Sequence, residues 1–268
     1  MIFVRPLIII FFAFLLQGVH GQGYEPPATR SSKLLIRDFL HMHMDYPEQA
    51  LSDREEGIVT LAFTVDEDGG TSNIKVTASV SPSVDSAALK LFRIILWEPA
   101  TYYGVPASSE YEFKIKYNIK RYKSWVKKRG YTHIPVPYEP VSSSLKIYSL
   151  KELDKLPQAI VDPAYSSVLE FITKKLEMPE AAIKLNLTGT VTLRFVLETN
   201  GLPSNIMVIE PLGGGCTEEA IRVVQMIRWV PGMKQNEAVR TCYDMELNFR
   251  PPDELKSKQI PNQGNSGL

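Results

Sequence analysis

The chain has 268 residues, and its 30 lysines and arginines balance 30 aspartates and glutamates, so the formal net charge is zero. This is the composition of an ordinary globular protein, with a length that suits one or two domains. The balanced charge argues against a dedicated nucleic-acid binder, which normally carries a basic excess.

Residues 1–21 have the pattern of a secretory signal peptide. Arg5 stands before an apolar run of ten residues, Leu7 to Leu16, and Gly21 ends the segment with a small residue. The run is shorter than the roughly 20 residues that a membrane-spanning helix needs. We therefore expect cleavage after Gly21 and export to the periplasm. If the segment is retained, it would instead anchor the protein to the inner membrane.

The rest of the chain contains one pattern twice. With a shift of 132 residues, the segment from Tyr46 to Asn118 aligns with the second copy without insertion or deletion, and 18 of 73 positions are identical. A period of this length indicates tandem domains, because solenoid repeats are roughly 20–50 residues long. We assign domain 1 to residues 32–119 and domain 2 to residues 164–250.

The first half of each domain predicts a helix and a β-hairpin. Residues 34–44 and 168–176 have the spacing of short amphipathic helices. Large apolar residues then alternate over 59–65 and 191–197, which indicates strands with one buried face. Tight hairpin turns need positive φ angles, and the dipeptides that favour them are Asp68-Gly69 and Asn200-Gly201.

The second half of each domain predicts another helix and a last strand. Asp85 and Thr217 are the expected N-caps of the helices, which end near Trp97 and Trp229, two expected core residues. The last strands are marked by alternating apolar residues, namely Tyr111, Phe113, Ile115 and Tyr117 in domain 1 and Tyr243, Met245, Leu247 and Phe249 in domain 2. The predicted fold class is α+β: two tandem small domains, each helix–β–β–helix–β with a three-stranded antiparallel sheet packed on helix.

Residues 120–163 form the predicted linker, which is basic from Lys120 to Arg129 and proline-rich further on. Such a basic run is either a solvated face or a contact for an anionic polymer. Residues 251–268 are polar and rich in Gly and Asn, so we expect a disordered tail.

The sequence offers no catalytic constellation and no cofactor motif. No nucleophile, base and orienting group occur together, and His41 and His43 lie on different sides of their predicted helix, so they cannot share a metal. Cys216 follows three glycines but has no histidine nearby in the sequence. We therefore expect no enzyme activity, no metal, no cofactor and no small-molecule substrate.

Cys216 and Cys242 are the two cysteines of the chain, and both belong to domain 2. Disulfides persist in exported proteins, but the sequence does not show whether the two Cα atoms lie within bridging distance. A disulfide and a pair of packed free thiols therefore both remain open.

The last strand of each domain carries the functional prediction. A strand with one polar face at the end of a small sheet is expected to be an edge, and an open edge can pair with an extended peptide of a partner. The alternative is an edge that is covered by the other domain or by the linker. Small sheets with free edges also leave a homodimer open.

The repeated pattern resembles the C-terminal domain of TonB-type energy transducers. The features shared with that family are, in domain 1, Tyr46-Pro47-x-x-Ala50, Gly57, Phe63, Gly69, Ala88, Trp97-x-Pro99 and the strand Tyr111 to Tyr117. In domain 2 they are Gly189, Phe195, Asn200-Gly201, Ala220, Trp229-x-Pro231 and the strand Tyr243 to Phe249. Domain 2 departs from the pattern at Met178, which replaces the first tyrosine.

The resemblance implies a periplasmic domain that binds outer-membrane receptors, or other envelope proteins, by pairing its last strand with a short extended segment, in TonB-dependent transport. The binding residues it implies are the two last strands, with Tyr46 and Pro47 nearby. Only about 25 residues separate the apolar start from Tyr46, so we do not expect the chain to transduce energy alone. The alternative function is a structural envelope scaffold whose basic linker contacts cell-wall polymer, without a role in transport.

Overall fold

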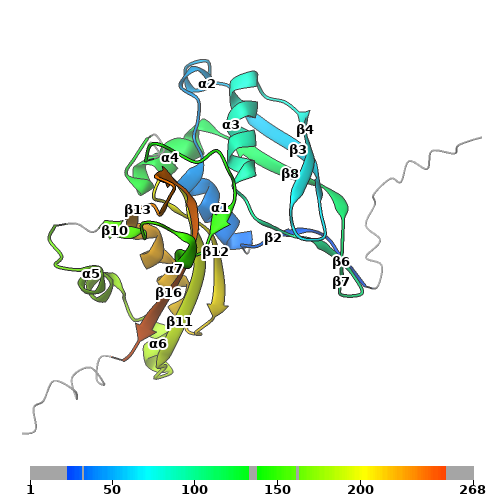
Figure 1. The fold of residues 1–268 in the computed structure, drawn as a ribbon. Helices are drawn as coiled ribbons and strands as arrows, with labels where there is room; N and C mark the ends of the chain where they lie inside the picture. Colours follow the sequence, from blue (N-terminus) through cyan, green and yellow to red (C-terminus); the bar gives the residue numbers. More distant parts are fainter. Residues whose placement is uncertain (1–22, 32, 133–137, 161–162, 252–268) are drawn as a thin grey trace, which may run out of the picture.

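The computed structural model describes residues 23–31, 33–132, 138–160 and 163–251 (Figure 1). The predicted signal peptide and, apart from Pro251, the predicted tail lie outside the described residues. Within the described part, no helix is both long and apolar enough to cross a membrane.

Domain 1 is built on a three-stranded antiparallel sheet, as predicted. The strand order is β4 (Thr71–Ala78), β3 (Gly57–Val65) and β8 (Ser109–Tyr117), and β3 pairs with β8 over its full length. Its helices are α1 (Lys33–His43), α2 (Glu48–Ser52) and α3 (Pro82–Arg93). Short strands flank the sheet: β1 (Tyr24–Glu25), β2 (Ala28–Thr29), β5 (Trp97–Glu98), β6 (Ala100–Tyr102) and β7 (Val105–Ala107).

Domain 2 repeats this arrangement and adds one strand. The order is β12 (Pro203–Glu210), β11 (Gly189–Leu197), β16 (Arg240–Phe249) and β9 (Ile147–Tyr148), where β9 comes from the linker and pairs in parallel. Its helices are α5 (Val168–Lys175), α6 (Glu180–Lys184) and α7 (Cys216–Met226), and its short strands are β13 (Arg228–Val230), β14 (Met233–Lys234) and β15 (Glu237–Ala238). The α+β class and the tandem arrangement are confirmed.

The predicted hairpin glycines occupy equivalent and crowded positions. Gly69 has φ +84° and Gly201 has φ +76°, a backbone conformation that residues with a Cβ atom rarely adopt. A Cβ atom at Gly69 would lie 2.3 Å from the carbonyl oxygen of Trp97, and one at Gly201 would lie 2.0 Å from that of Trp229. The turn therefore needs glycine for two reasons, its φ angle and its contact with the tryptophan backbone.

The two tryptophans belong to the cores, as predicted. Trp97 is 2% exposed and Trp229 is 3% exposed. Trp97 packs on Phe63 with ring centroids 4.8 Å apart, and Trp229 packs on Tyr243 at the same distance. Trp97 thus links the end of α3 to the buried face of its sheet, and Trp229 does the same for α7.

The predicted N-caps were wrong, because both helices begin earlier than expected. Helix α3 begins at Pro82, and the Ser81 side chain accepts the cap hydrogen bond from the backbone N–H of Val84. The Asp85 carboxylate instead accepts from the N–H of Val80. Helix α7 begins at Cys216, directly after Gly215. The hydroxyl of Thr217, inside the first turn, exchanges hydrogen bonds with the backbone of Leu212.

The linker contains ordered elements that the sequence interpretation did not include. Helix α4 (Ile119–Arg129) starts at the Asn118 cap and ends at Gly130, whose φ is +78°. Further on lie η1 (Leu150–Glu152) and β10 (Gln158–Ile160), and β10 pairs with β13 of domain 2. The linker therefore folds onto both domains.

Helix α1 lies between the two sheets (Figure 1). Leu35 on this helix packs in the core of domain 2, whereas Phe39, one turn further on, packs in the core of domain 1. At its end, His43 is 5% exposed and donates a hydrogen bond from Nε2 to the carbonyl oxygen of Pro203 at 2.8 Å. The two domains therefore share α1 as a common packing element.

Candidate functional site

The outer edge of β16 is open over most of its length. On the inner side, β16 pairs with β11 from Thr241 to Phe249. On the outer side, β9 pairs only with Arg240 and Thr241. From Tyr243 to Phe249, no other strand of the described residues pairs with this edge. Its backbone N–H and C=O groups can therefore accept a further strand.

An apolar groove of about 470 Å³ lies beside this open edge, between α5 and the end of β16. The helix side is formed by Leu169, Ile172, Thr173 and Leu176, and the strand side by residues 246–250. Leu169 is 73% exposed, although it is a large apolar residue. Edge and groove together form a surface that offers backbone hydrogen bonds and apolar contacts side by side.

The side chains of β16 alternate between the core and the outside. Leu247 and Phe249 are 1% and 2% exposed, and Tyr243 and Met245 pack partly buried against the same core. Because two of the four predicted side chains are buried, a partner at this strand would meet the backbone and the groove more than the side chains.

In domain 1, β8 occupies the equivalent edge. Among the residues that the structure describes, β3 is its only partner strand. Ile115 and Tyr117 are buried, while Tyr111 and Phe113 are partly buried against the core. Burial raises the pKa of Tyr117, so this phenol stays neutral in the folded protein.

Tyr46 and Pro47, the two residues expected near the binding edge, differ in burial. The Tyr46 ring is 1% exposed, and its hydroxyl donates to the carbonyl oxygen of Glu55. Burial raises the pKa of Tyr46 to about 12. Pro47 is the residue before α2 and is partly exposed. The structure thus places Tyr46 in the core of domain 1.

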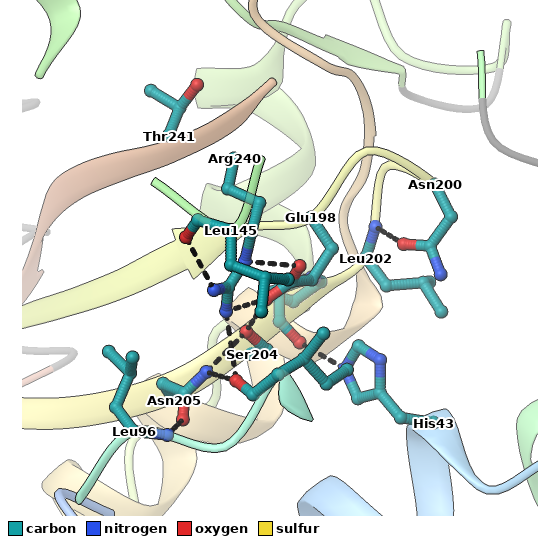
Figure 2. A network of polar contacts seen from close by, with 12 residues as sticks. His43, Leu96, Leu145, Glu198, Asn200, Leu202, Ser204, Asn205, Arg240 and Thr241 are labelled. Atoms are coloured by element: carbon teal, nitrogen blue, oxygen red, sulfur yellow. Dashed lines mark hydrogen bonds and ion pairs between the residues drawn. The ribbon is translucent and has the colours of Figure 1, made fainter. Parts of the chain in front are cut away.

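A buried polar network at the hairpin end of domain 2 was not predicted from the sequence (Figure 2). Arg240 and Glu198, both 4% exposed, form a two-point ion pair with contacts of 2.8 and 2.9 Å. The hydroxyl of Ser204 donates to the same carboxylate at 2.5 Å. A buried pair of this kind is stable only while all its partners are present.

The network extends across the domain boundary. The Asn205 side chain donates to the carbonyl oxygen of Ile94 and accepts from the N–H of Leu96, each at 2.8 Å. Arg240 also donates to the carbonyl oxygen of Ile94, at 2.9 Å. Figure 2 shows Asn205 beside Leu96, and Arg240 beside Glu198 in the same network. Two backbone groups of domain 1 are therefore satisfied by side chains of domain 2.

The sequence carried a signal for this network, but an ambiguous one. Ser204 and Asn205 are identical to Ser72 and Asn73 of domain 1. In domain 1, the Asn73 side chain is exposed and bonds the hydroxyl of Thr64. The same residue types therefore lie on a strand near the surface in one copy and make an interdomain contact in the other, and only the fold distinguishes them.

The two cysteines are free thiols in the structure, so the disulfide that the sequence left open is not formed there. Cys216 is buried and Cys242 is partly buried, and burial raises the pKa of each thiol. A raised pKa disfavours the nucleophilic thiolate. Across the described residues, no group of three or more His, Cys, Asp or Glu side chains is placed to hold a metal ion.

The fold is an α+β domain present twice, and the last strand of the second copy has an outer edge that is largely unpaired among the described residues. The chain belongs to the family described as the Gram-negative bacterial TonB protein C-terminal domain, which matches residues 42–119 and 174–251, more than half of the chain. Domains of this family are periplasmic and non-enzymatic.

Two solved structures are similar to parts of the chain. Both are NMR solution structures of the Helicobacter pylori TonB C-terminal domain, and both are 22% identical to this chain. One covers 34% of this chain and 98% of its own, with a TM-score of 0.25; the other covers 32% and 78%, with a TM-score of 0.24. A search of curated proteins gives no match.

Proposed function

We propose that this protein is a periplasmic adaptor that binds extended segments of outer-membrane receptors, or of other envelope proteins, and acts in TonB-dependent transport. The segment would add as a strand to β16. The observation that carries the proposal is the outer edge from Tyr243 to Phe249, which has no partner strand among the described residues. Backbone pairing along such an edge provides affinity, and side-chain pockets beside it provide specificity.

The linker supports the choice of β16 as the binding strand. Strand β9 pairs with Arg240 and Thr241 on the same outer edge, which supports a further strand there. Its pairing stops there, and the edge beyond it faces the groove that α5 lines. A bound peptide would extend the ladder along Tyr243–Phe249.

The experiment is a binding titration of receptor peptides whose backbone amides are methylated at alternate positions. In a β-ladder, only every second residue of an added strand points its N–H at the edge. Methylation of one alternate set should abolish binding, whereas methylation of the other set, with the same composition, should leave binding nearly unchanged. Equal effects of the two sets, or no binding of the unmethylated peptides, would contradict strand addition.

One observation supports the alternative function, a structural envelope scaffold that contacts cell-wall polymer. Lys120, Lys123, Lys127 and Lys128 on α4 are exposed, so a basic helix surface is available to an anionic wall polymer. Changing Lys127 and Lys128 to glutamine should then abolish co-sedimentation with purified wall material at low salt. If the unchanged protein does not sediment with that material, this second function is wrong.

A further inference from the structure

In domain 1, the apolar face of α4 covers the surface between α1 and the end of β8. The Tyr122 ring, 2% exposed, lies against Tyr46 with centroids 5.3 Å apart. One turn further on, Trp125 packs against the His41 ring at 5.9 Å, and His41 donates from Nε2 to the carbonyl oxygen of Trp125 at 3.2 Å. Two aromatic side chains three residues apart thus anchor this helix.

Arg129 fixes the other end of α4 on the first helix. Its guanidinium donates to the carbonyl oxygens of His41 and Met44 at 3.0 and 2.9 Å, where α1 ends. It also lies 5.4 Å from the Tyr122 ring centre, a cation–π distance. In domain 1, α4 therefore closes the end of α1 with hydrogen bonds as well as with apolar contacts.

The open groove of domain 2 is the equivalent of the place that α4 covers. The shift of 132 residues relates the surface under α4 to the groove lining, matching His41 to Thr173, Met44 to Leu176, Tyr46 to Met178 and Tyr117 to Phe249. In domain 1, the surface equivalent to the groove is thus occupied by a helix with two aromatic side chains. In domain 2, no helix of the described residues lies there, and Leu169 is left 73% exposed.

The sequence after β16 lacks aromatic residues at the positions that would correspond to Tyr122 and Trp125 of α4. The positions equivalent to Tyr122 and Trp125 are Glu254 and Ser257, neither of which is apolar. The aromatic pair that anchors α4 in domain 1 therefore has no counterpart at the equivalent positions after β16.

We propose that the groove between α5 and β16 binds an amphipathic helix of a partner protein that presents two aromatic side chains three residues apart. The aromatic pair would fill the apolar space lined by Ile172, Leu176 and Met178, as Tyr122 and Trp125 fill its equivalent. Aromatic side chains are the usual anchors of helix-in-groove recognition. The proposal concerns side-chain packing in the groove and does not rest on strand addition to β16.

The probe is a peptide of residues 118–130, the chain's own α4, titrated into the chain from Gln22 onward and followed by NMR. Saturable shifts of the methyl groups of Ile172, Leu176 and Met178 are expected. A peptide with Trp125→Ala should bind at least about tenfold more weakly, because an aromatic anchor is removed.

Two variants of the protein locate the binding. Leu169→Glu places a charge in the groove at an exposed position and should abolish the shifts. Leu185→Glu is the matched control, because Leu185 is 66% exposed and lies outside the groove lining; it should bind the peptide as the unchanged protein does.

Four outcomes would overturn the proposal. They are no saturable shifts, shifts that Leu169→Glu leaves unchanged, groove shifts that follow protein concentration without peptide, and peptide binding that requires removal of residues 253–268. The third result would make a second copy the occupant, and the fourth would make the chain's own tail the occupant.

Discussion

Domain 1 and domain 2 present the same sheet in different surroundings. At the end of β8, the chain continues into α4, which packs its aromatic residues over Tyr46 and the end of α1. At the end of β16, no helix of the described residues covers the groove beside Phe249. The two copies therefore differ in what covers them more than in how they fold, and we propose domain 2 as the copy that binds a partner.

The hairpin ends of the two domains also differ, but here domain 2 is the more deeply buried copy. In domain 1, Ser72 and Asp66 form a partly buried contact of 3.4 Å. Their equivalents in domain 2, Ser204 and Glu198, are buried together with Arg240 under the backbone of domain 1. Among the described residues, domain 2 is thus covered at its hairpin end and uncovered at the end of its last strand.

The largest expected effect is that of Arg240→Met, which removes one partner of the buried ion pair. We expect the free energy of unfolding to fall by about 3–5 kcal/mol, because Glu198 would remain buried as an unpaired charge. Denaturant unfolding measures this change.

Arg194→Met is the matched control for that substitution. Arg194 also forms a two-point ion pair, with Asp244 at 2.7 Å, but the two side chains are 44% and 50% exposed. Removing an exposed pair should cost about 0–1 kcal/mol. Equal losses for the two variants would contradict the conclusion that the ion pair of Arg240 is buried and that of Arg194 is exposed.

The next largest effect tests the packing of α4 on domain 1. Tyr122→Ala should lower the free energy of unfolding by about 3 kcal/mol, because a buried aromatic ring leaves a cavity between α4 and α1. The control is Tyr138→Ala, since Tyr138 is 39% exposed; it should change stability by about 0.5 kcal/mol or less. A small loss for Tyr122→Ala would mean that α4 does not stabilise domain 1.

A third effect is the pH dependence that His43 confers. Burial lowers the pKa of His43, while the hydrogen bond to Pro203 and the charge of Glu198 oppose the shift, and Arg129 and Arg228 add to it. The unfolded chain therefore takes up the proton first as the pH falls below about 6.5. Stability is fully present above that pH and is lost as the pH falls towards the folded-state pKa, by at most about 1.4 kcal/mol per pH unit.

Urea unfolding between pH 7 and pH 5 measures this slope, and His43→Gln should flatten it. His41→Gln should flatten it less, because His41 is only partly buried and its pKa is also lowered by burial. If His43→Gln keeps the slope of the unchanged protein, His43 is not the group that titrates.

The smallest effect concerns the thiols. Without reductant, Cys242 should react slowly with a thiol reagent in the native state, and Cys216 should react only after denaturation, because it is buried at 0% exposure. Counting labelled cysteines by mass spectrometry after denaturation should give both. If neither reacts until a reductant is added, the two cysteines form a disulfide in solution.

Much of each sheet could be predicted from the sequence, because strand alternation and turn residues are local. Gly69 and Gly201 mark the hairpins, and Trp97 and Trp229 mark the cores, in both copies. The open edge of β16 was one of two predicted edges, and it could not be distinguished from that of β8, since the difference depends on what packs beside each strand.

The surroundings of the domains could not be predicted in the same way. The basic residues of α4 suggested a solvated linker, although Tyr122, Trp125 and Val126 have the spacing of an apolar helix face. The burial of Asn205 depends on Ile94, which is more than one hundred residues away in the sequence. Such contacts follow from the packing of two folded domains and leave no periodic pattern in either.

The measurement that tests the central claim most directly is amide hydrogen exchange along both last strands, with and without a peptide from the N-terminus of an outer-membrane receptor. We expect the peptide to slow exchange at Tyr243–Phe249, because its ladder would protect the outer amides of β16, and to leave Ser109–Tyr117 unchanged. Unchanged exchange along Tyr243–Phe249 at saturating peptide, or protection confined to β8, would contradict the account.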